Sequence, residues 1–217
     1  MIRIETFVNR PIDENTYVVS DDTRDAVIID CGALFPDDQQ AIADYISRED
    51  LRVTAHILTH GHFDHMFGAQ WVADTYGYTP RLHHADATIY ASAVDLVSAF
   101  FHRRIEFDVP PAGGFFEDDA TLRFGTHTIR IIPCAGHTRG GVCLYLEDEG
   151  VLFSGDSIFQ GSIGRTDMEG GDHQALIDNL LEHVLTLPES VIIYPGHGPH
   201  TMVQNEKLYN PYVRRGF

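Results

Sequence analysis

The spacing of hydrophobic and polar positions changes from block to block along this chain. Some blocks have the spacing typical of strands and others that of helices. Apolar residues in short runs or at every second position are typical of strands. They predict strands over 2–8, 16–21, 26–30, 53–59, 81–84, 142–148, 151–156 and 190–198, and a hairpin over 120–133. Apolar residues at helical spacing predict helices over 36–50, 66–77, 85–101, 170–188 and 201–209.

Helix boundaries carry their own signals. Pro36 opens the first predicted helix, Gly77 closes the second, and Asp172 is the expected N-cap of the helix over 170–188. Each residue type suits its place, because proline tolerates the first helical turn, glycine ends helices and aspartate caps them. The proline- and glycine-rich stretch 109–119 is expected to be an exposed loop.

The order of the predicted elements indicates an α/β fold. Strands and helices alternate at long intervals, with several hairpins, which favours helices covering the outside of two packed sheets. We expect residues 1–217 to form a single domain, since the length suits one large domain. Polar motifs follow several predicted strands, and open sheet folds place their active sites at such strand ends.

Metal-ligand residue types crowd at four of these strand ends. The segments are "THGHFDH", "CAGHTRGG", "FSGDSIF" and "YPGHGPHT". Together they offer His60, His62, Asp64, His65, His137, Asp156 and His197. Imidazoles and carboxylates suit zinc, iron or manganese, and the lack of thiolates among them argues against a structural zinc knuckle. We expect Cys31, Cys134 and Cys143 to be reduced packing residues.

The spacing within the first segment suggests two neighbouring ion sites. His60 and His62 are two residues apart, so in extended backbone they project the same way. Asp64 and His65 lie beyond them, where the chain turns towards a helix, and can face a second ion. A solvated histidine-rich loop is the alternative. The Gly-His and Gly-Asp strand ends downstream argue against it.

The net charge of −17 narrows the range of partners. Nucleic acid would be repelled, because phosphate binding needs basic patches. Two explanations of the acidity stand side by side: adaptation to a high-salt cytoplasm, where salt screens the self-repulsion, and genome-level codon bias. No apolar run is long enough for a membrane span, and the first residues lack a signal-peptide pattern, so we expect a cytoplasmic protein with no membrane partner.

The four motifs, in this order, resemble those of the metallo-β-lactamase-fold superfamily. "THGHFDH" matches its HxHxDH signature, and the "GHT", "GDS" and "PGH" segments match its later motifs. The resemblance implies a four-layer αββα sandwich with two divalent metal ions at one edge, zinc first, with iron or manganese as alternatives. It also implies a ligand set: His60, His62 and His137 for the first ion, Asp64, His65 and His197 for the second, and Asp156 between them.

Within that superfamily the chain is similar to compact enzymes of the glyoxalase II type, the hydroxyacylglutathione hydrolases. "GRTD" followed by "GGDH", and Glu206 with "NPY" near the end, carry this resemblance. The chain departs at Arg139, where the family has proline. It also has only 20 residues after His197 (217 − 197), without the C-terminal helical domain that helps full-length glyoxalase II hold glutathione. The thiol carrier is therefore left open.

The implied reaction is hydrolysis of a small-molecule thioester or related acyl compound. Two cations lower the pKa of a shared water, and the hydroxide attacks the acyl carbon while a cation stabilises the oxyanion. Asp64 and Asp156 are the catalytic candidates. Arg165 and Arg139 are candidates for substrate binding, and an ion pair with Asp167 is the structural alternative for Arg165.

Two rival activities share the ligand pattern: a persulfide dioxygenase with a single iron, and a lactonase. The sequence leaves open whether the chain is a monomer or a homodimer. Among the remaining histidines, His173 and His200 are candidates to orient a metal ligand. His56 is expected to be an ordinary surface or interface residue, and His83 and His84 to point to opposite faces of their strand.

Overall fold

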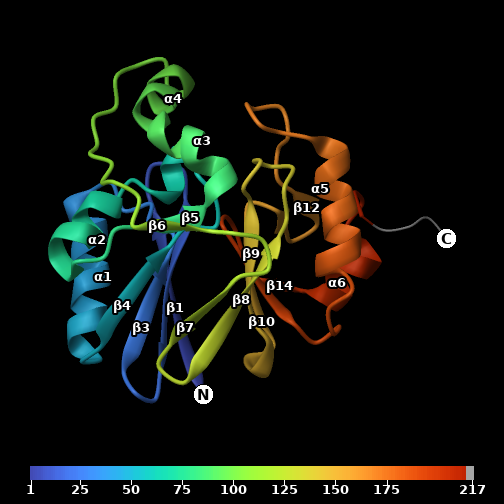
Figure 1. Ribbon diagram of the computed structural model, residues 1–217, viewed down its shortest axis with the longest axis horizontal. Coiled ribbons are helices and arrows are strands. Elements are labelled where there is room, and N and C mark those ends of the chain that lie inside the picture. Colours follow the sequence, from blue (N-terminus) through green and yellow to red (C-terminus); the bar gives the residue numbers. More distant parts are fainter. Residues whose placement is uncertain (214–217) are drawn as a thin grey trace.

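Two six-stranded sheets form the centre of the molecule in the computed structural model, which describes residues 1–213 (Figure 1). The first sheet has the order β1-β2-β3-β4-β5-β6. Its antiparallel half is β1 (Ile2–Asn9), β2 (Glu14–Asp21) and β3 (Asp25–Ile29), and its parallel half adds β4 (Arg52–Ile57), β5 (Arg81–His83) and β6 (Gly114–Phe116).

The second sheet has the order β14-β13-β10-β9-β8-β7. Its strands are β7 (Thr121–Phe124), β8 (His127–Pro133), β9 (Val142–Leu146), β10 (Val151–Gly155), β13 (Ile192–Pro195) and β14 (Thr201–Met202). A small separate hairpin is made by β11 (Ile158–Phe159) and β12 (Ser162–Ile163).

Helices cover the outer faces of both sheets (Figure 1). On the first sheet lie α1 (Pro36–Arg48) and α2 (Ala69–Tyr76), on the second α5 (His173–Asn179) and α6 (Val203–Tyr209), while α3 (Ala87–Ala91) and α4 (Ala93–Phe100) sit above the sheets. Short turns of helix are η1 (Phe63–His65), η2 (His84–Asp86), η3 (Glu147–Glu149) and η4 (Leu180–Val184). The predicted αββα sandwich is confirmed.

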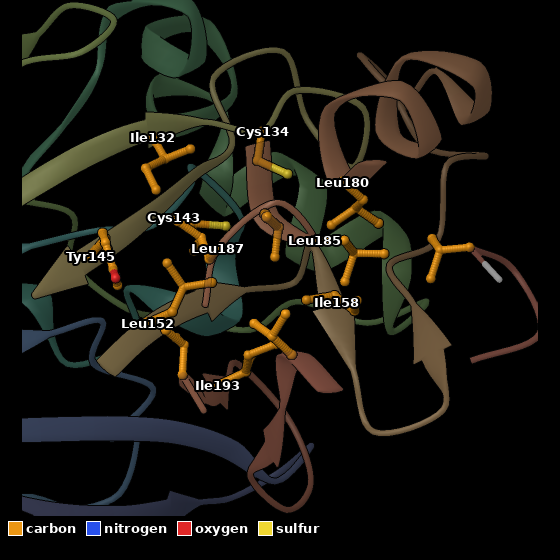
Figure 2. Packing of buried hydrophobic residues seen from close by; sticks show 14 of the residues in the cluster. Ile132, Cys134, Cys143, Tyr145, Leu152, Ile158, Leu180, Leu185, Leu187 and Ile193 are labelled. Carbon is orange, nitrogen blue, oxygen red and sulfur yellow. The ribbon is translucent and has the colours of Figure 1, made fainter. Parts of the chain in front are cut away.

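The hydrophobic core follows the layers. Between the sheets, Tyr17 packs on Phe153 with ring centroids 5.0 Å apart, among aliphatic residues of both sheets. A second cluster joins the first sheet to α1 and α2. A third joins the second sheet to α5 and its neighbours, and Figure 2 shows Leu152 and Ile193 of the sheet in the same cluster as Leu180 and Leu185. Cys134 and Cys143 are buried free thiols in this third cluster, as expected of packing residues.

The predicted helix boundaries hold at three places. Pro36 is the first residue of α1, and Gly77 ends α2 in the left-handed conformation with φ of 79°. Asp172 caps α5 by accepting a hydrogen bond of 3.0 Å from the Ala175 backbone N–H. These signals are local, which is why sequence alone identifies them.

Two predictions of local structure were wrong. The stretch 109–119 is not wholly an exposed loop, because its centre forms β6, which pairs in parallel with β5 and buries Phe116 to 3% exposure. The predicted helix over 85–101 is broken at Ser92 into α3 and α4. For 109–119, pairing with β5 outweighs the local propensity for a loop.

Within residues 1–213, every helix is too short or too polar to cross a bilayer. That the whole of residues 1–217 forms one domain stays a prediction, and residues 214–217 lie outside the described part of the chain.

Candidate metal centre

The seven candidate ligands converge because four strand ends meet at one edge of the sandwich. The "THGHFDH" segment follows β4 of the first sheet, and its second half turns into η1. His137 follows β8, Asp156 follows β10, and His197 follows β13, all in the second sheet. The centre therefore spans the seam between the two sheets.

Three histidines form a first ligand group. His62 Nδ1 lies 3.2 Å from His60 Nε2 and 2.9 Å from His137 Nε2. All three side chains are buried, and these nitrogens face one another. Three neutral imidazoles converging on one point are a frequent zinc-binding arrangement.

A second group contains Asp64, His65 and His197. Asp64 Oδ2 lies 3.2 Å from His197 Nε2 and 3.6 Å from His65 Nε2. His197 is the most accessible of the three, with 25% of its side chain exposed. The second group is thus open on the His197 side.

Asp156 lies between the two groups. Its Oδ2 is 3.6 Å from His137 Nε2 of the first group and 3.7 Å from His197 Nε2 of the second. Its Oδ1 is 3.3 Å from His65 Nε2. One carboxylate therefore faces ligands of both groups, which is the geometry of a bridge.

The residues fit two cations on physical grounds. Tetrahedral ligands about 2.0–2.1 Å from an ion stand about 3.3 Å apart, and the separations within each group are close to this value. His65 Nε2 and Asp156 Oδ1 are buried polar atoms without a hydrogen-bond partner. Such atoms are costly unless something satisfies them, and a cation between them does so.

The outward-facing nitrogens of the histidines are held by fixed acceptors. His137 Nδ1–H donates to the Arg165 carbonyl (2.7 Å), and His197 Nδ1–H donates to the Asp13 carbonyl (3.1 Å). His65 Nδ1–H donates to Asp30 Oδ2 at 2.9 Å. When the rings are neutral, this tautomer leaves each Nε2 with a lone pair towards the centre.

Asp30 also supports the first group. The Thr59 backbone N–H and hydroxyl each donate to the Asp30 carboxylate at 2.8 Å. The Thr59 hydroxyl in turn accepts from His60 Nδ1 at 3.1 Å. A single buried carboxylate thereby orients one histidine of each group.

Electrostatics prepare the first group and Asp156 for cations. Burial lowers the pKa of His62 to about 4 and that of His60 well below its usual range, so both rings are neutral near pH 7. Burial alone would raise the pKa of Asp156, but nearby His65 holds it well below the ordinary value. Neutral imidazoles and an ionised carboxylate are the forms that bind metals. In the second group, nearby carboxylates outweigh burial and raise the pKa of His65 and of His197, so a cation must displace protons there.

Asp86 ties the two halves of the first group together. It is fully buried at the end of η2. Its Oδ2 accepts from the Gly61 N–H (2.9 Å), between His60 and His62, and from the Thr138 hydroxyl (2.7 Å), next to His137. Its Oδ1 accepts from the Gly140 N–H at 2.6 Å. One side chain thus fixes two ligand loops.

Strand β2 holds the His197 loop. Asn15 Nδ2 donates to the carbonyls of Pro195 and Gly198, each at 2.9 Å, and the Tyr17 hydroxyl donates to the Pro195 carbonyl at 2.6 Å. Gly196 must be glycine, since a Cβ there would overlap the Asp156 carboxylate and the His65 ring. Steric crowding therefore explains the glycine of the "PGH" motif.

The two candidate substrate arginines lie in different places. Arg165 lines the cavity above the candidate ligands, and its guanidinium donates to Asp167 at 2.7 and 2.9 Å. Arg139 is exposed and lines a separate cavity beside Gly136 and Gly170. That either arginine binds substrate stays a prediction.

The other histidines correct several expectations. His173 and His200 are exposed and make no hydrogen bond to a ligand. His56 is not a surface residue: it is buried to 1% exposure, and neither ring nitrogen has a partner. The rings of His83 and His84 lie 4.4 Å apart rather than on opposite faces, because β5 ends at His83.

Sequence reasoning missed Asp30 and Asp86 as supporting residues. Both stand just past short strands of the first sheet, as the ligands themselves do. The signal that selected the candidate ligands, a polar residue directly after a buried strand, also applies to Asp30. For Asp86, η2 intervenes, so the signal is weaker.

Comparison with protein-family models matches residues 9–197 to the metallo-beta-lactamase superfamily. Among curated proteins, a probable metallo-hydrolase, YqgX of Bacillus subtilis, is 35% identical over 94% of this chain and 93% of its own length. Hydroxyacylglutathione hydrolase GloC of Haemophilus influenzae is 29% identical over 98% of each chain.

Solved structures agree with this fold. The B3 metallo-beta-lactamase BLEG-1 has a TM-score of 0.90 and 36% identity, over 98% of this chain and 100% of its own. TTHA1623 in a di-iron-bound form has a TM-score of 0.83 and 30% identity, over 97% of this chain and 100% of its own.

Proposed function

The chain belongs to the metallo-β-lactamase superfamily as a metallo-hydrolase, and from that premise we propose that it hydrolyses small-molecule thioesters with two metal ions, as hydroxyacylglutathione hydrolases do. The observation that carries the proposal is the pair of ligand groups that share Asp156 beneath one cavity. Two cations held by these groups would suit attack of a water on an acyl carbon.

The cations would be held by His60, His62 and His137 on one side and by Asp64, His65 and His197 on the other. When bound, they supply Lewis acidity, which brings the pKa of a water near neutrality and polarises the acyl carbonyl. Zinc is our first choice for this set of imidazoles and carboxylates, with iron or manganese as alternatives.

The protein's own groups complete the reaction. Asp64 faces the cavity, and its neighbours His65 and His197 keep it ionised against the effect of burial, with its pKa lowered. An ionised carboxylate beside the reacting water can accept its proton and orient it. Asp156 helps to position both ligand groups, because its two oxygens face His65 on one side and His137 on the other.

The similar proteins support different substrates for the proposed hydrolysis. The name of GloC gives the thioester class, at 29% identity over nearly the full length of both chains. BLEG-1, at 36% identity, is a β-lactamase by its title, so β-lactam hydrolysis is the second candidate. Among the described residues that line the cavity there is no serine or cysteine to act as a nucleophile. This is consistent with metal-dependent hydrolysis of either a thioester or a β-lactam.

A hydrolysis panel on protein whose metals have been counted tests the proposal. The panel contains S-D-lactoylglutathione, simple acyl thioesters, a lactone and a β-lactam, each with and without chelator. We expect thioesters to be the fastest substrates, with activity lost on chelation. His62→Ala should abolish turnover, while the matched change His183→Ala, at an exposed helix position, should leave it intact.

Two outcomes would overturn the proposal. One is a β-lactam or lactone that is turned over with a higher kcat/KM than every thioester. The other is oxygen consumption with glutathione persulfide by protein that hydrolyses none of the panel, which would point to a persulfide dioxygenase.

A further inference from the structure

The cavity above the metal ligands has an apolar side. Its volume is about 160 Å³, and its floor is made of ligands, among them His62, Asp64 and Asp156. Its walls are formed mainly by Ile12, Phe63, Phe100 and Met168, with Arg165. These residues come from four separate segments, so the apolar wall is a product of the tertiary fold.

Phe100 is the outer part of this wall. It lies at the end of α4, and its ring stands 5.4 Å from the Phe63 ring, centroid to centroid. It is 43% exposed, although a large aromatic side chain gains by burial. Phe63 is buried to 3% and packs on Phe67 behind it, so the wall has a rigid base.

The charged residues of the apolar wall are unsuited to an anionic substrate group. Among residues 1–213, Arg165 is the one Lys or Arg side chain that lines the cavity. Its guanidinium is engaged in two hydrogen bonds by Asp167, whose pKa Arg165 lowers to about 2, so the pair is neutral as a unit. The chain as a whole carries −17. A free carboxylate on the substrate therefore finds no unpaired cation among the described residues of this wall.

We propose that this wall selects thioesters whose acyl group is uncharged and apolar, with Phe100 as a specificity-determining residue. The inference rests on the proposed thioester hydrolysis and narrows its substrate class. The acyl chain would lie against Phe63 and Phe100 with its carbonyl towards Asp64 and Asp156. Each methylene buried there should raise kcat/KM about fourfold until the cavity is full.

Acyl thioesters of one neutral thiol, N-acetylcysteamine, test this directly. Acetyl, butyryl, hexanoyl and succinyl derivatives are compared on protein of known metal content. We expect kcat/KM to rise from acetyl to hexanoyl and to be at least tenfold lower for succinyl than for hexanoyl. Phe100→Ala should reduce the hexanoyl-to-acetyl ratio at least fivefold. Phe35→Ala, a partly exposed phenylalanine elsewhere, should leave the ratio unchanged.

A binding measurement separates this inference from the proposed function. S-hexyl-N-acetylcysteamine and its S-carboxypropyl counterpart cannot be hydrolysed, and their affinities are measured by calorimetry on chelator-treated protein. Tighter binding of the hexyl compound, weakened by Phe100→Ala, supports the apolar wall even if no thioester is hydrolysed. Equal or reversed affinities, or a flat acyl series with active enzyme, would overturn the inference while thioester hydrolysis stands.

Discussion

Replacing Asp86 with asparagine should weaken both the fold and the first ligand group. In the native protein three donors converge on this carboxylate, from Gly61, Thr138 and Gly140. The amide oxygen can still accept from Gly61 and Thr138 if it takes the place of Oδ2. Its NH₂ group then faces the Gly140 N–H, so two buried donors point at each other and the Gly140 N–H has no acceptor.

The magnitude follows from that single lost acceptor. A buried donor left without a partner costs about 1–3 kcal/mol. We therefore expect Asp86→Asn to lower the free energy of unfolding by about 1–3 kcal/mol. Asp86→Ala orphans all three donors and should cost about 3 kcal/mol or more, a large part of a typical total stability of about 5–15 kcal/mol.

The assay combines urea denaturation of metal-free protein with competition against a chromophoric chelator. The ligand loops carrying His60, His62 and His137 lose their common anchor, so metal affinity should fall about 10- to 100-fold. Asp95→Asn, at an exposed position of α4, is the matched control and should stay within about 0.5 kcal/mol of wild type. Unchanged stability and metal affinity in Asp86→Asn would refute the reasoning.

Three further predictions address burial, metal support and charge. Burial lowers the pKa of His56 from 6.5 to about 3, so the unfolded chain takes up a proton between these pH values that the folded protein does not. The free energy of unfolding should therefore fall by about 1.4 kcal/mol per pH unit as the pH drops from 6.5 towards 3. Urea titrations at several pH values should show this loss in wild type and in the exposed His183→Gln variant, and a shallower slope in His56→Phe; equal slopes would contradict it. Asp30→Asn should lower the affinity of both ligand groups in a chelator competition, because Asp30 orients His65 directly and His60 through Thr59; an effect on neither group would count against that role. Melting temperature should rise from low to molar salt if the net charge of −17 destabilises the fold, and a flat salt series would refute this.

Sequence predicted the layers and the clustering of the candidate ligands better than it predicted the residues that support them. The seven candidate ligands belong to local motifs at strand ends, so spacing and resemblance were enough to select residues that the fold brings together; that they bind metal stays a prediction. Strand β6 was missed because its pairing with β5 depends on residues about 30 positions earlier, and "GFF" alone has no strand periodicity.

Asp86 was missed for a related reason. Its three partners lie 25, 52 and 54 residues away in sequence. No local pattern encodes such contacts. His56 was misjudged because its strand, β4, is covered on both faces, which a lone polar residue does not reveal.

The placement of the ligand centre across the seam has a consequence for the protein's lifetime. Four ligands follow the first sheet and three follow the second, so ions held there would staple the two halves of the sandwich. An ion present at about 100 times its dissociation constant would add about 2.7 kcal/mol to stability. Metal shortage would then lower the amount of folded protein through unfolding and proteolysis, in addition to inactivating the molecules that stay folded.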